Sequence, residues 1–386
     1  MKKLIALALA ALMIFALVAC ADSTTPTEAK PAETQAAKPA ETQAAKPAET
    51  QAPAPAPAAD ETALVGVSMP TKDLQRWNQD GANMEKLLKE AGYEVDLQFG
   101  ANDANLQVSQ IENMIANGAK VVVISAIDGD ALGTVLAQAK EAGCKVIAYD
   151  RLIMGSDAVN YYATFDNTLV GVMQGEYIEK ALNLAAGGNY NIEFITGDPG
   201  DNNINFFYDG AMSVLQKYLD NGTLTCQSGQ VAKMDVATEG WSSENAQNRF
   251  ETILNTYYAD KQLDAVMCSN DSTAQGVAAA LASSYNNSVY PILTGQDCDI
   301  VSTINMMDGK QAMSVFKDTR DLAAKAVEMV DAIVKGGEPP INDTETYDNG
   351  TGIIPSYLCS PKVCTKDTIK EILLDSGYYT EADLAH

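Results

Sequence analysis

VVVISAIDGDALGTVLAQAKEAGCKVIAYDR, residues 121–151, is the clearest structural signal in this chain of 386 residues. It begins and ends with runs of Val, Ile and Ala that alternate little with polar residues, which is typical of parallel strands buried on both faces. Between these runs, residues 130–142 have the spacing of an amphipathic helix, and Gly143 follows where a helix needs a left-handed cap. The segment therefore predicts a βαβ unit with a right-handed crossover.

The same alternation of short apolar runs and longer amphipathic segments continues through the chain from about residue 62. The expected strands are 64–68, 95–98, 121–125, 145–149, 161–164, 191–195, 224–228, 264–267, 291–294 and 312–316. The expected helices are 73–91, 104–117, 130–142, 168–182, 203–220, 243–257, 271–285, 299–308 and 319–335. These are more strands than one compact open sheet of this length usually carries, so the pattern predicts an α/β protein with two parallel sheets. A break is expected near residues 164–167, where a strand ends without an apolar continuation.

The first 61 residues are of a different kind. Two lysines precede a short apolar run that ends in Leu17-Val18-Ala19-Cys20, which predicts a secretory signal over residues 1–19. The residues that end in Cys20 resemble a bacterial lipobox, in which the Cys directly after the cleavage site carries the lipid. The alternatives are an ordinary signal peptide with a chance Cys and a short anchor helix. Residues 30–53 repeat Lys-Pro-Ala-Glu-Thr-Gln-Ala-Ala, which offers little to bury, so we expect residues 20–61 to be a disordered, semi-rigid linker between a lipid anchor and the folded part.

Charge and cysteine usage exclude several classes of function. The formal net charge of −25 repels phosphate backbones and provides no polybasic membrane patch, so nucleic acid is not an expected partner. The single histidine, His386, is terminal, and the cysteines lack the paired spacing of a zinc site. Cys359 and Cys364 could pair in a small loop or remain two free thiols, and the sequence does not choose between these states.

Polar and aromatic side chains follow nearly every predicted strand, and ligands of doubly wound sheets bind outside the carboxyl ends of the strands. Asp, Asn and Arg make directional hydrogen bonds that suit vicinal hydroxyls. The chain has two tryptophans, both at such strand ends, and their flat faces suit the C–H faces of a pyranose, so together they could sandwich a sugar ring. Because the side chains come from both halves of the chain, we expect a cleft between two domains. The candidate ligand-binding residues are Arg76, Trp77, Asp128, Asp150, Arg151, Asp201, Asn203, Trp241, Asn270, Asp297 and Lys317.

Each candidate taken alone has a plainer explanation. Trp77 fits a core position, since Met84 and Leu88 continue a helical apolar stripe. Asp150 with Arg151 could be a surface ion pair or a helix start, and Lys317 could be solvated. Their coincidence at strand ends is what favours a site.

Other chemistries fit less well. Residues 201–212 begin like a calcium loop, but Phe206 and Met212 replace the Gly and Glu that such a loop requires. No Gly-rich phosphate loop follows a strand. Asp150 and Asp297 could form the acid/base pair of a glycosidase, but Asn and Arg around them suit recognition of an intact sugar. We therefore expect no metal, no cofactor and no catalytic residue.

Motifs at these same positions resemble those of a known family. The chain resembles the periplasmic xylose-binding proteins and, more closely, the multiple-monosaccharide-binding proteins of sugar ABC importers, over residues 64–384. The segment 207–216 in particular favours the multiple-sugar branch. The motifs are at residues 74–77, 110–115, 147–151, 165–167, 201–203, 269–271, 295–297, 315–317 and 207–216.

The resemblance implies a type I periplasmic-binding-protein fold, in which two doubly wound parallel-sheet lobes are joined by a three-crossing hinge. It places the crossings near 166–167, near 296–297 and around 338–350. The first lobe would contain residues 62–166 and 298–340, and the second residues 167–297 and 341–386. It further implies that the two tryptophans stack on the sugar and that the other candidates hydrogen-bond it, with Asp128 at a position where the related proteins differ.

The function implied is a non-enzymatic, monomeric receptor outside the cytoplasm, lipid-anchored to the cell membrane. It would bind an aldopyranose such as xylose, glucose, galactose or arabinose and deliver it to an ABC transporter permease. Two alternatives stay open: a sugar-sensing component for a chemoreceptor or histidine kinase, and a secreted carbohydrate-active enzyme. Which sugar it binds, and how tightly, cannot be read from the residues.

Overall fold

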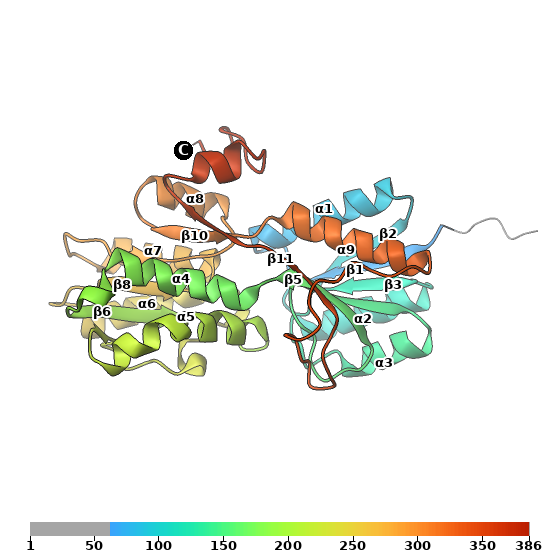
Figure 1. Ribbon diagram of the computed structural model, residues 1–386, viewed down its shortest axis with the longest axis horizontal. Coiled ribbons are helices and arrows are strands. Elements are labelled where there is room, and N and C mark those ends of the chain that lie inside the picture. Colours follow the sequence, from blue (N-terminus) through green and yellow to red (C-terminus); the bar gives the residue numbers. More distant parts are fainter. Residues whose placement is uncertain (1–61, 386) are drawn as a thin grey trace, which may run out of the picture. The chain divides into compact units, whose positions relative to one another are not determined.

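The computed structural model describes residues 62–385, which fold into two lobes (Figure 1). The signal peptide, the lipid-bearing Cys20 and the linker predicted for residues 1–61 lie outside the described residues, as does His386. Within residues 62–385, no helix combines the length and the hydrophobicity needed to cross a bilayer.

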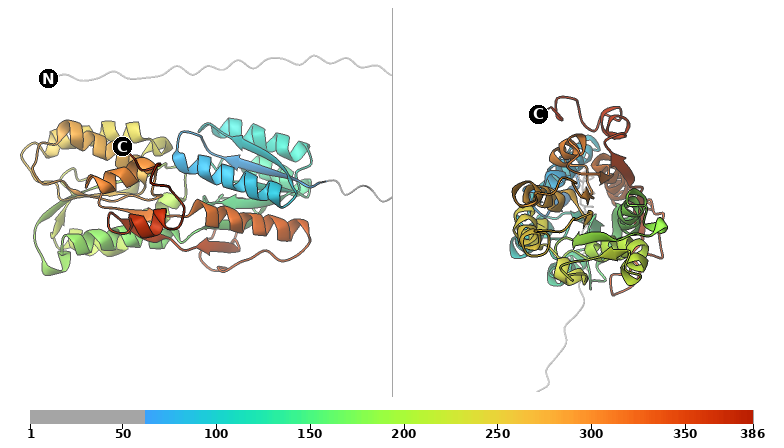
Figure 2. Two further views of the ribbon diagram at one scale, coloured as in Figure 1. Left: turned by 90° about the horizontal axis from the view of Figure 1, so that it is seen from above. Right: turned by 90° about the vertical axis from the view of Figure 1, so that its left-hand side faces the viewer.

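The first lobe is built on a six-stranded, fully parallel sheet in the order β11-β5-β4-β3-β1-β2. Its strands are β1 (Leu64–Met69), β2 (Glu94–Phe99), β3 (Val121–Ile124), β4 (Lys145–Tyr149), β5 (Val159–Phe165) and β11 (Ser356–Cys359). Four helices flank it: α1 (Gln75–Glu90), α2 (Ala104–Ala116), α3 (Gly133–Glu141) and α9 (Thr319–Val334). The side views show helices on both faces of the sheet (Figure 2).

Strand β3 shows why the apolar run predicts a doubly covered sheet. All four of its residues are fully buried. Because successive side chains of a strand point to opposite faces, Val121 and Val123 pack with the core under α1 and α9, whereas Val122 and Ile124 pack with the core under α2 and α3. The βαβ unit predicted from residues 121–151 is confirmed.

The second lobe has a four-stranded parallel sheet in the order β7-β6-β8-β9. Its strands are β6 (Tyr190–Ile195), β7 (Leu224–Thr225), β8 (Ala265–Cys268) and β9 (Ile292–Leu293). Its helices are α4 (Asn167–Ala181), α5 (Asn203–Asp220), α6 (Ser243–Tyr257), α7 (Asp271–Ser284) and α8 (Ile300–Met307). A parallel bridge between Gln296 and Val315 adds β10 (Met313–Phe316) beside this sheet, and β10 pairs antiparallel with β12 (Lys362–Thr365).

The strand pairing corrects two of the three expected crossings between the lobes. The first lies where predicted, between β5 and α4. The second is not near 296–297, because β10 still pairs within the second lobe; the chain crosses between β10 and α9, at residues 316–319. The third is not at 338–350, because β11 pairs with β5 of the first lobe; it lies between β11 and β12, at residues 359–362. Residues 298–316 therefore belong to the second lobe, and residues 341–359 to the first.

The two cysteines left open by the sequence are free and lie in different cores. Cys359 on β11 packs in the first lobe beneath α1 and α9. Cys364 on β12 packs in the second lobe, in a cluster that also contains Cys298. The third crossing separates them, which explains why no loop disulfide forms.

Candidate ligand-binding site

A cavity lies between the lobes at the carboxyl ends of the strands. Every predicted site residue except Asp128 lines it: Arg76, Trp77, Asp150, Arg151, Asp201, Asn203, Trp241, Asn270, Asp297 and Lys317. Its walls also contain residues that were not predicted: Leu74, Phe207, Ser272, Gln296 and Asp299. Asp150 directly follows β4, and Lys317 directly follows β10, as the strand-end rule requires.

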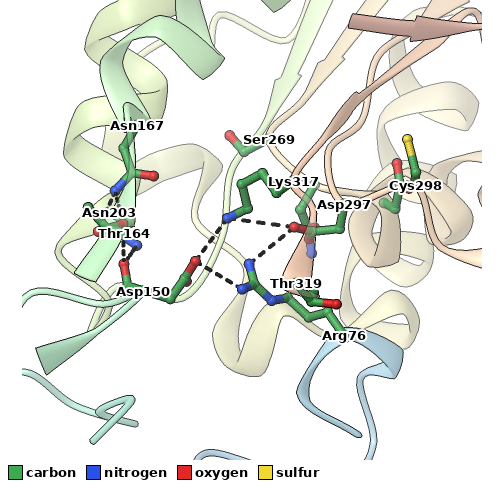
Figure 3. A network of polar contacts seen from close by, with 12 residues as sticks. Arg76, Asp150, Thr164, Asn167, Asn203, Ser269, Asp297, Cys298, Lys317 and Thr319 are labelled. Atoms are coloured by element: carbon green, nitrogen blue, oxygen red, sulfur yellow. Dashed lines mark hydrogen bonds and ion pairs between the residues drawn. The ribbon is translucent and has the colours of Figure 1, made fainter. Parts of the chain in front are cut away.

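One side of the cavity is a network of ion pairs that crosses between the lobes (Figure 3). Arg76, near the start of α1, places one guanidinium nitrogen 3.0 Å from the carboxylate of Asp150 and another 3.2 Å from that of Asp297 in the second lobe. Lys317 lies 3.1 Å from Asp150 and 3.6 Å from Asp297. Two cations and two carboxylates thus alternate around a ring, and all four side chains are buried.

The network fixes the charge state of its members. Burial alone would raise the pKa of Asp150, but Arg76 and Lys317 outweigh it and lower the pKa to about 2. Burial likewise opposes the charge of Arg76, while Asp150 and Asp80 raise its pKa well above the ordinary value. Asp150 and Arg76 are therefore both charged at neutral pH although they are buried.

Asp80 contacts Arg76 of this network but does not line the cavity. It was not among the predicted site residues. It is fully buried on α1, one turn after Arg76, and accepts a hydrogen bond from Arg76 Nε at 3.1 Å and one from the hydroxyl of Tyr149. Burial, which outweighs the attraction of Arg76, raises the pKa of Asp80 to about 6. The Arg–Asp pair at i and i+4 on a predicted helix is the signal that could have revealed it.

A second side of the cavity is formed by Trp241 of the second lobe, whose indole is held by residues of both lobes. The indole N–H donates to the carboxylate of Asp201 at 3.2 Å, and Arg151 Nε lies 2.9 Å from the same carboxylate. The ring of Phe207 meets the indole edge to face, with centroids 6.2 Å apart. The indole lies so close to Gly197 that a Cβ there would stand 2.2 Å from three ring atoms.

Trp77 is both a core residue and a wall of the cavity. It is 2% exposed and packs with Met84 in the core of the first lobe, as the apolar stripe of the predicted helix indicated. It also lines the cavity, where the guanidinium carbons of Arg76 and Arg151 lie 4.4 and 5.0 Å from its ring centroid. The core position and the position in the cavity wall that the sequence predicted for Trp77 are therefore compatible.

Three of the lining residues have backbone that L-amino acids rarely adopt. The φ angles of Asp150, Trp241 and Asp297 are 58°, 55° and 100°. Such conformations persist where the surroundings hold them in place, and they concentrate at binding and catalytic sites. The strain adds independent support for a functional cavity.

Comparison with known proteins identifies the family of this chain. A family profile described as "Periplasmic binding protein domain" matches residues 65–338. The chain belongs to the periplasmic binding protein family. It is 49% identical over 328 residues to the "Multiple sugar-binding periplasmic protein SbpA" of Azospirillum brasilense, covering 84% of this chain and 92% of that protein. It is 34% identical to the "D-xylose-binding periplasmic protein" of Escherichia coli K12, covering 83% of this chain and 92% of that protein.

A solved structure is closer in sequence. An ABC transporter solute binding protein from Clostridium phytofermentans, crystallised with bound β-D-glucose, is 65% identical and superposes with a TM-score of 0.83. The match covers 83% of this chain and 100% of that chain. A carbohydrate transporter solute binding protein from Chloroflexus aurantiacus, in complex with D-glucose, is 33% identical with a TM-score of 0.77, covering 84% of this chain and 98% of that chain.

Asp128 is the predicted site residue that lies away from the cavity of this binding protein. Its carboxylate accepts the backbone N–H of Asp130 at 2.9 Å and so caps its own loop. The next residue, Gly129, donates its backbone N–H to the carbonyl of Gly200 in the second lobe at 3.1 Å. The loop after β3 thus meets the other lobe beside the cavity, through its backbone.

The two asparagines contribute partly through structure. Asn203 is fully buried and donates to the backbone carbonyl of Asp150 at 2.7 Å, beside the first crossing (Figure 3). Asn270 caps α7 through its side-chain oxygen, which accepts the N–H of Thr273, and its amide nitrogen donates to Ser272 at 2.8 Å. Among the described residues, no cluster of three or more His, Cys, Asp or Glu side chains is arranged to hold a metal ion.

Proposed function

We propose that this protein is an extracytoplasmic receptor that encloses one neutral monosaccharide, an aldopyranose, between its lobes. The observation that carries the proposal is the cavity itself, where two indoles and a ring of charged and amide side chains from both lobes converge. Proteins similar to this chain carry sugar-binding names or were crystallised with glucose. We infer that the predicted residues lining the cavity are those that contact the sugar.

The pairing of charges argues for a neutral ligand. Arg76 and Lys317 share Asp150 and Asp297, and Arg151 is paired with Asp201. No cation lining the cavity therefore depends on a ligand carboxylate or phosphate for its counter-charge. Paired carboxylates and guanidinium groups keep free lone pairs and N–H donors, and these match hydroxyls, which donate and accept at once.

The geometry also couples binding to closure of the lobes. Arg76 of the first lobe meets Asp297 of the second, and Asp150 of the first meets Lys317 at the second crossing. A ligand that contacts both lobes satisfies all of its hydrogen bonds only when they are closed, so it shifts the population toward that state. We infer that the closed, sugar-loaded form is the one presented to an ABC transporter permease.

Chemical conversion of the sugar is not part of the proposal. A glycosidase needs one carboxylic acid that can give up a proton and a second carboxylate beside it. The pKa of Asp150 is lowered to about 2 despite burial, since Arg76 and Lys317 hold it charged, so Asp150 itself does not serve as that acid at neutral pH. We expect glucose and xylose to be recovered chemically unchanged after prolonged incubation with the protein.

Calorimetric titration with a panel of aldoses tests the function. We expect D-glucose or D-xylose to bind with one site per chain, and sorbitol, the open-chain alcohol, to serve as a negative control. Failure of every aldose to bind would contradict the proposal.

Membrane attachment is tested separately. We propose that Cys20 is lipidated and that the linker over residues 20–61 tethers the receptor to the membrane. The Cys20→Ser variant should then leave the membrane fraction, while its sugar affinity stays that of the wild type. A variant that remains in the membrane fraction would contradict the tether.

A further inference from the structure

The last residues of the second lobe contact the first lobe away from the sugar cavity. Residues 370–385 lie beside α8 (Figure 1). Tyr379 is buried there among Cys298, Met306 and Phe316, and the ring of Tyr378 meets Phe316 edge to face with centroids 4.8 Å apart. Both rings therefore belong to the second lobe.

The hydroxyl groups of these two tyrosines form hydrogen bonds with side chains on α1 of the first lobe. Tyr379 accepts a hydrogen bond from Gln75 Nε2 at 2.6 Å, and Tyr378 donates to Gln79 Oε1 at 3.1 Å. Gln75 also accepts, through Oε1, the backbone N–H of Ile300 at the start of α8, at 3.0 Å. Gln79 Nε2 also donates to the hydroxyl of Tyr379 at 3.5 Å, so two side chains on one face of α1 hold four hydrogen bonds to the second lobe.

The position of Gln75 links this contact to the sugar site without touching it. Gln75 precedes Arg76, which binds Asp297 across the cleft, and Tyr379 donates to the carbonyl of Cys298, the residue after Asp297. Neither glutamine and neither tyrosine lines the cavity. The same stretch of α1 therefore contacts the second lobe twice, once at the site and once outside it.

We propose that Tyr378, Tyr379, Gln75 and Gln79 form a closing clamp: a set of positioning residues that stabilises the closed lobes whichever sugar is bound. The clamp rests on the proposed sugar-receptor function. Its hydrogen bonds need both lobes together, as the sugar contacts do, so opening breaks them and closing restores them. Because the clamp does not meet the ligand, it multiplies the affinity for every sugar by one common factor.

The test is Tyr379→Phe, which keeps the packed ring and removes the hydroxyl. We expect the dissociation constants for D-glucose and D-xylose to rise by the same factor, about threefold to tenfold, with faster dissociation. Tyr93→Phe is the matched control, because the hydroxyl of Tyr93 bonds Asp331 within the first lobe at 2.7 Å. The control should lower the melting temperature and leave both dissociation constants unchanged.

A double-mutant cycle sharpens the test. Gln75→Ala and Tyr379→Phe should together weaken binding by less than the product of their separate effects, because they share a hydrogen bond. Unchanged affinity in Tyr379→Phe, or a loss that differs between the two sugars, would overturn the clamp while sugar binding by the wild type still supports the receptor function. A wild type that binds no aldose would overturn both.

Discussion

The two sides of the cavity are built on different physical principles. On one side, Arg76, Asp150, Asp297 and Lys317 form a ring of buried ion pairs that joins the two lobes. On the other, Trp241 stands within the second lobe, positioned by close packing on Gly197. Removing one ion leaves others buried without a partner, whereas removing the indole leaves a space. Both sides should therefore contribute to stability and affinity, the ion-pair side through paired charge and the indole side through packing.

The largest effect is expected for Asp150→Asn. Asn tolerates the positive φ of this position, so the change removes charge with little backbone strain. It takes from Arg76 and Lys317 the carboxylate that they share, and we expect a loss of about 3 kcal/mol in the free energy of unfolding and of about 100-fold in sugar affinity. Urea denaturation and calorimetry measure the two losses.

The control for this prediction is Asp157→Asn, which removes an exposed ion pair with Lys140. Both measured quantities should stay at their wild-type values. If Asp150→Asn lost affinity alone, the ion-pair side would not contribute to stability and the contrast between the two sides would be wrong.

Trp241→Ala should come next, with sugar affinity about tenfold lower or worse and the fold retained. The indole face is the apolar surface offered to the sugar ring, and the loop that carries it is held separately, through a hydrogen bond from Ser272 to the carbonyl of Trp241 at 2.7 Å. Calorimetry and circular dichroism follow affinity and fold. Wild-type affinity in the variant would remove Trp241 from the site.

A smaller loss of affinity is expected for Gly197→Ala. The added methyl group would stand 2.2 Å from the indole, so the ring must shift. We expect about fivefold weaker binding from this displacement, since overpacking is only partly relieved by movement. Titration of the variant with D-glucose measures it, and an unchanged dissociation constant would mean that the indole position is not critical.

The smallest expected effect is on the pH dependence of the free energy of unfolding, and it arises from Asp80 beside the ion-pair network. Burial raises the pKa of Asp80 to about 6, so the folded protein takes up its proton at higher pH than the unfolded chain does. The free energy of unfolding should therefore rise as the pH falls from 7 to 5, and Asp80 alone should contribute about 1 kcal/mol of that rise. Urea denaturation across this range should show a smaller rise for Asp80→Asn, and identical slopes would contradict the assignment.

Much of this structure could be predicted from local pattern. Strands such as β3 and β4 are short runs of buried Val, Ile and Ala, and the strand-end rule then brought Arg76, Asp150 and Lys317 to one cavity. Asp80 was not predicted because it lies inside α1, one turn after Arg76, and follows no strand directly. Its role depends on what Arg76 touches, which no local pattern records.

The hinge was the weakest prediction, for a related reason. Strands β11 and β12 are four residues each, adjoin without a helix between them, and pair with different lobes. Which sheet a short strand joins depends on pairing across long separations in sequence. The expected crossings near 296–297 and 338–350 were therefore wrong, and neither β11 nor β12 was predicted.

A crystal structure of the protein grown with D-glucose tests the central claim most directly, which is that one sugar lies in the cavity between the lobes. We predict a pyranose packed against Trp241 and hydrogen-bonded to Asp150 and Lys317, with the lobes closed. Glucose bound elsewhere on the molecule, or a cavity that excludes it while both indoles stay covered by protein, would contradict the account.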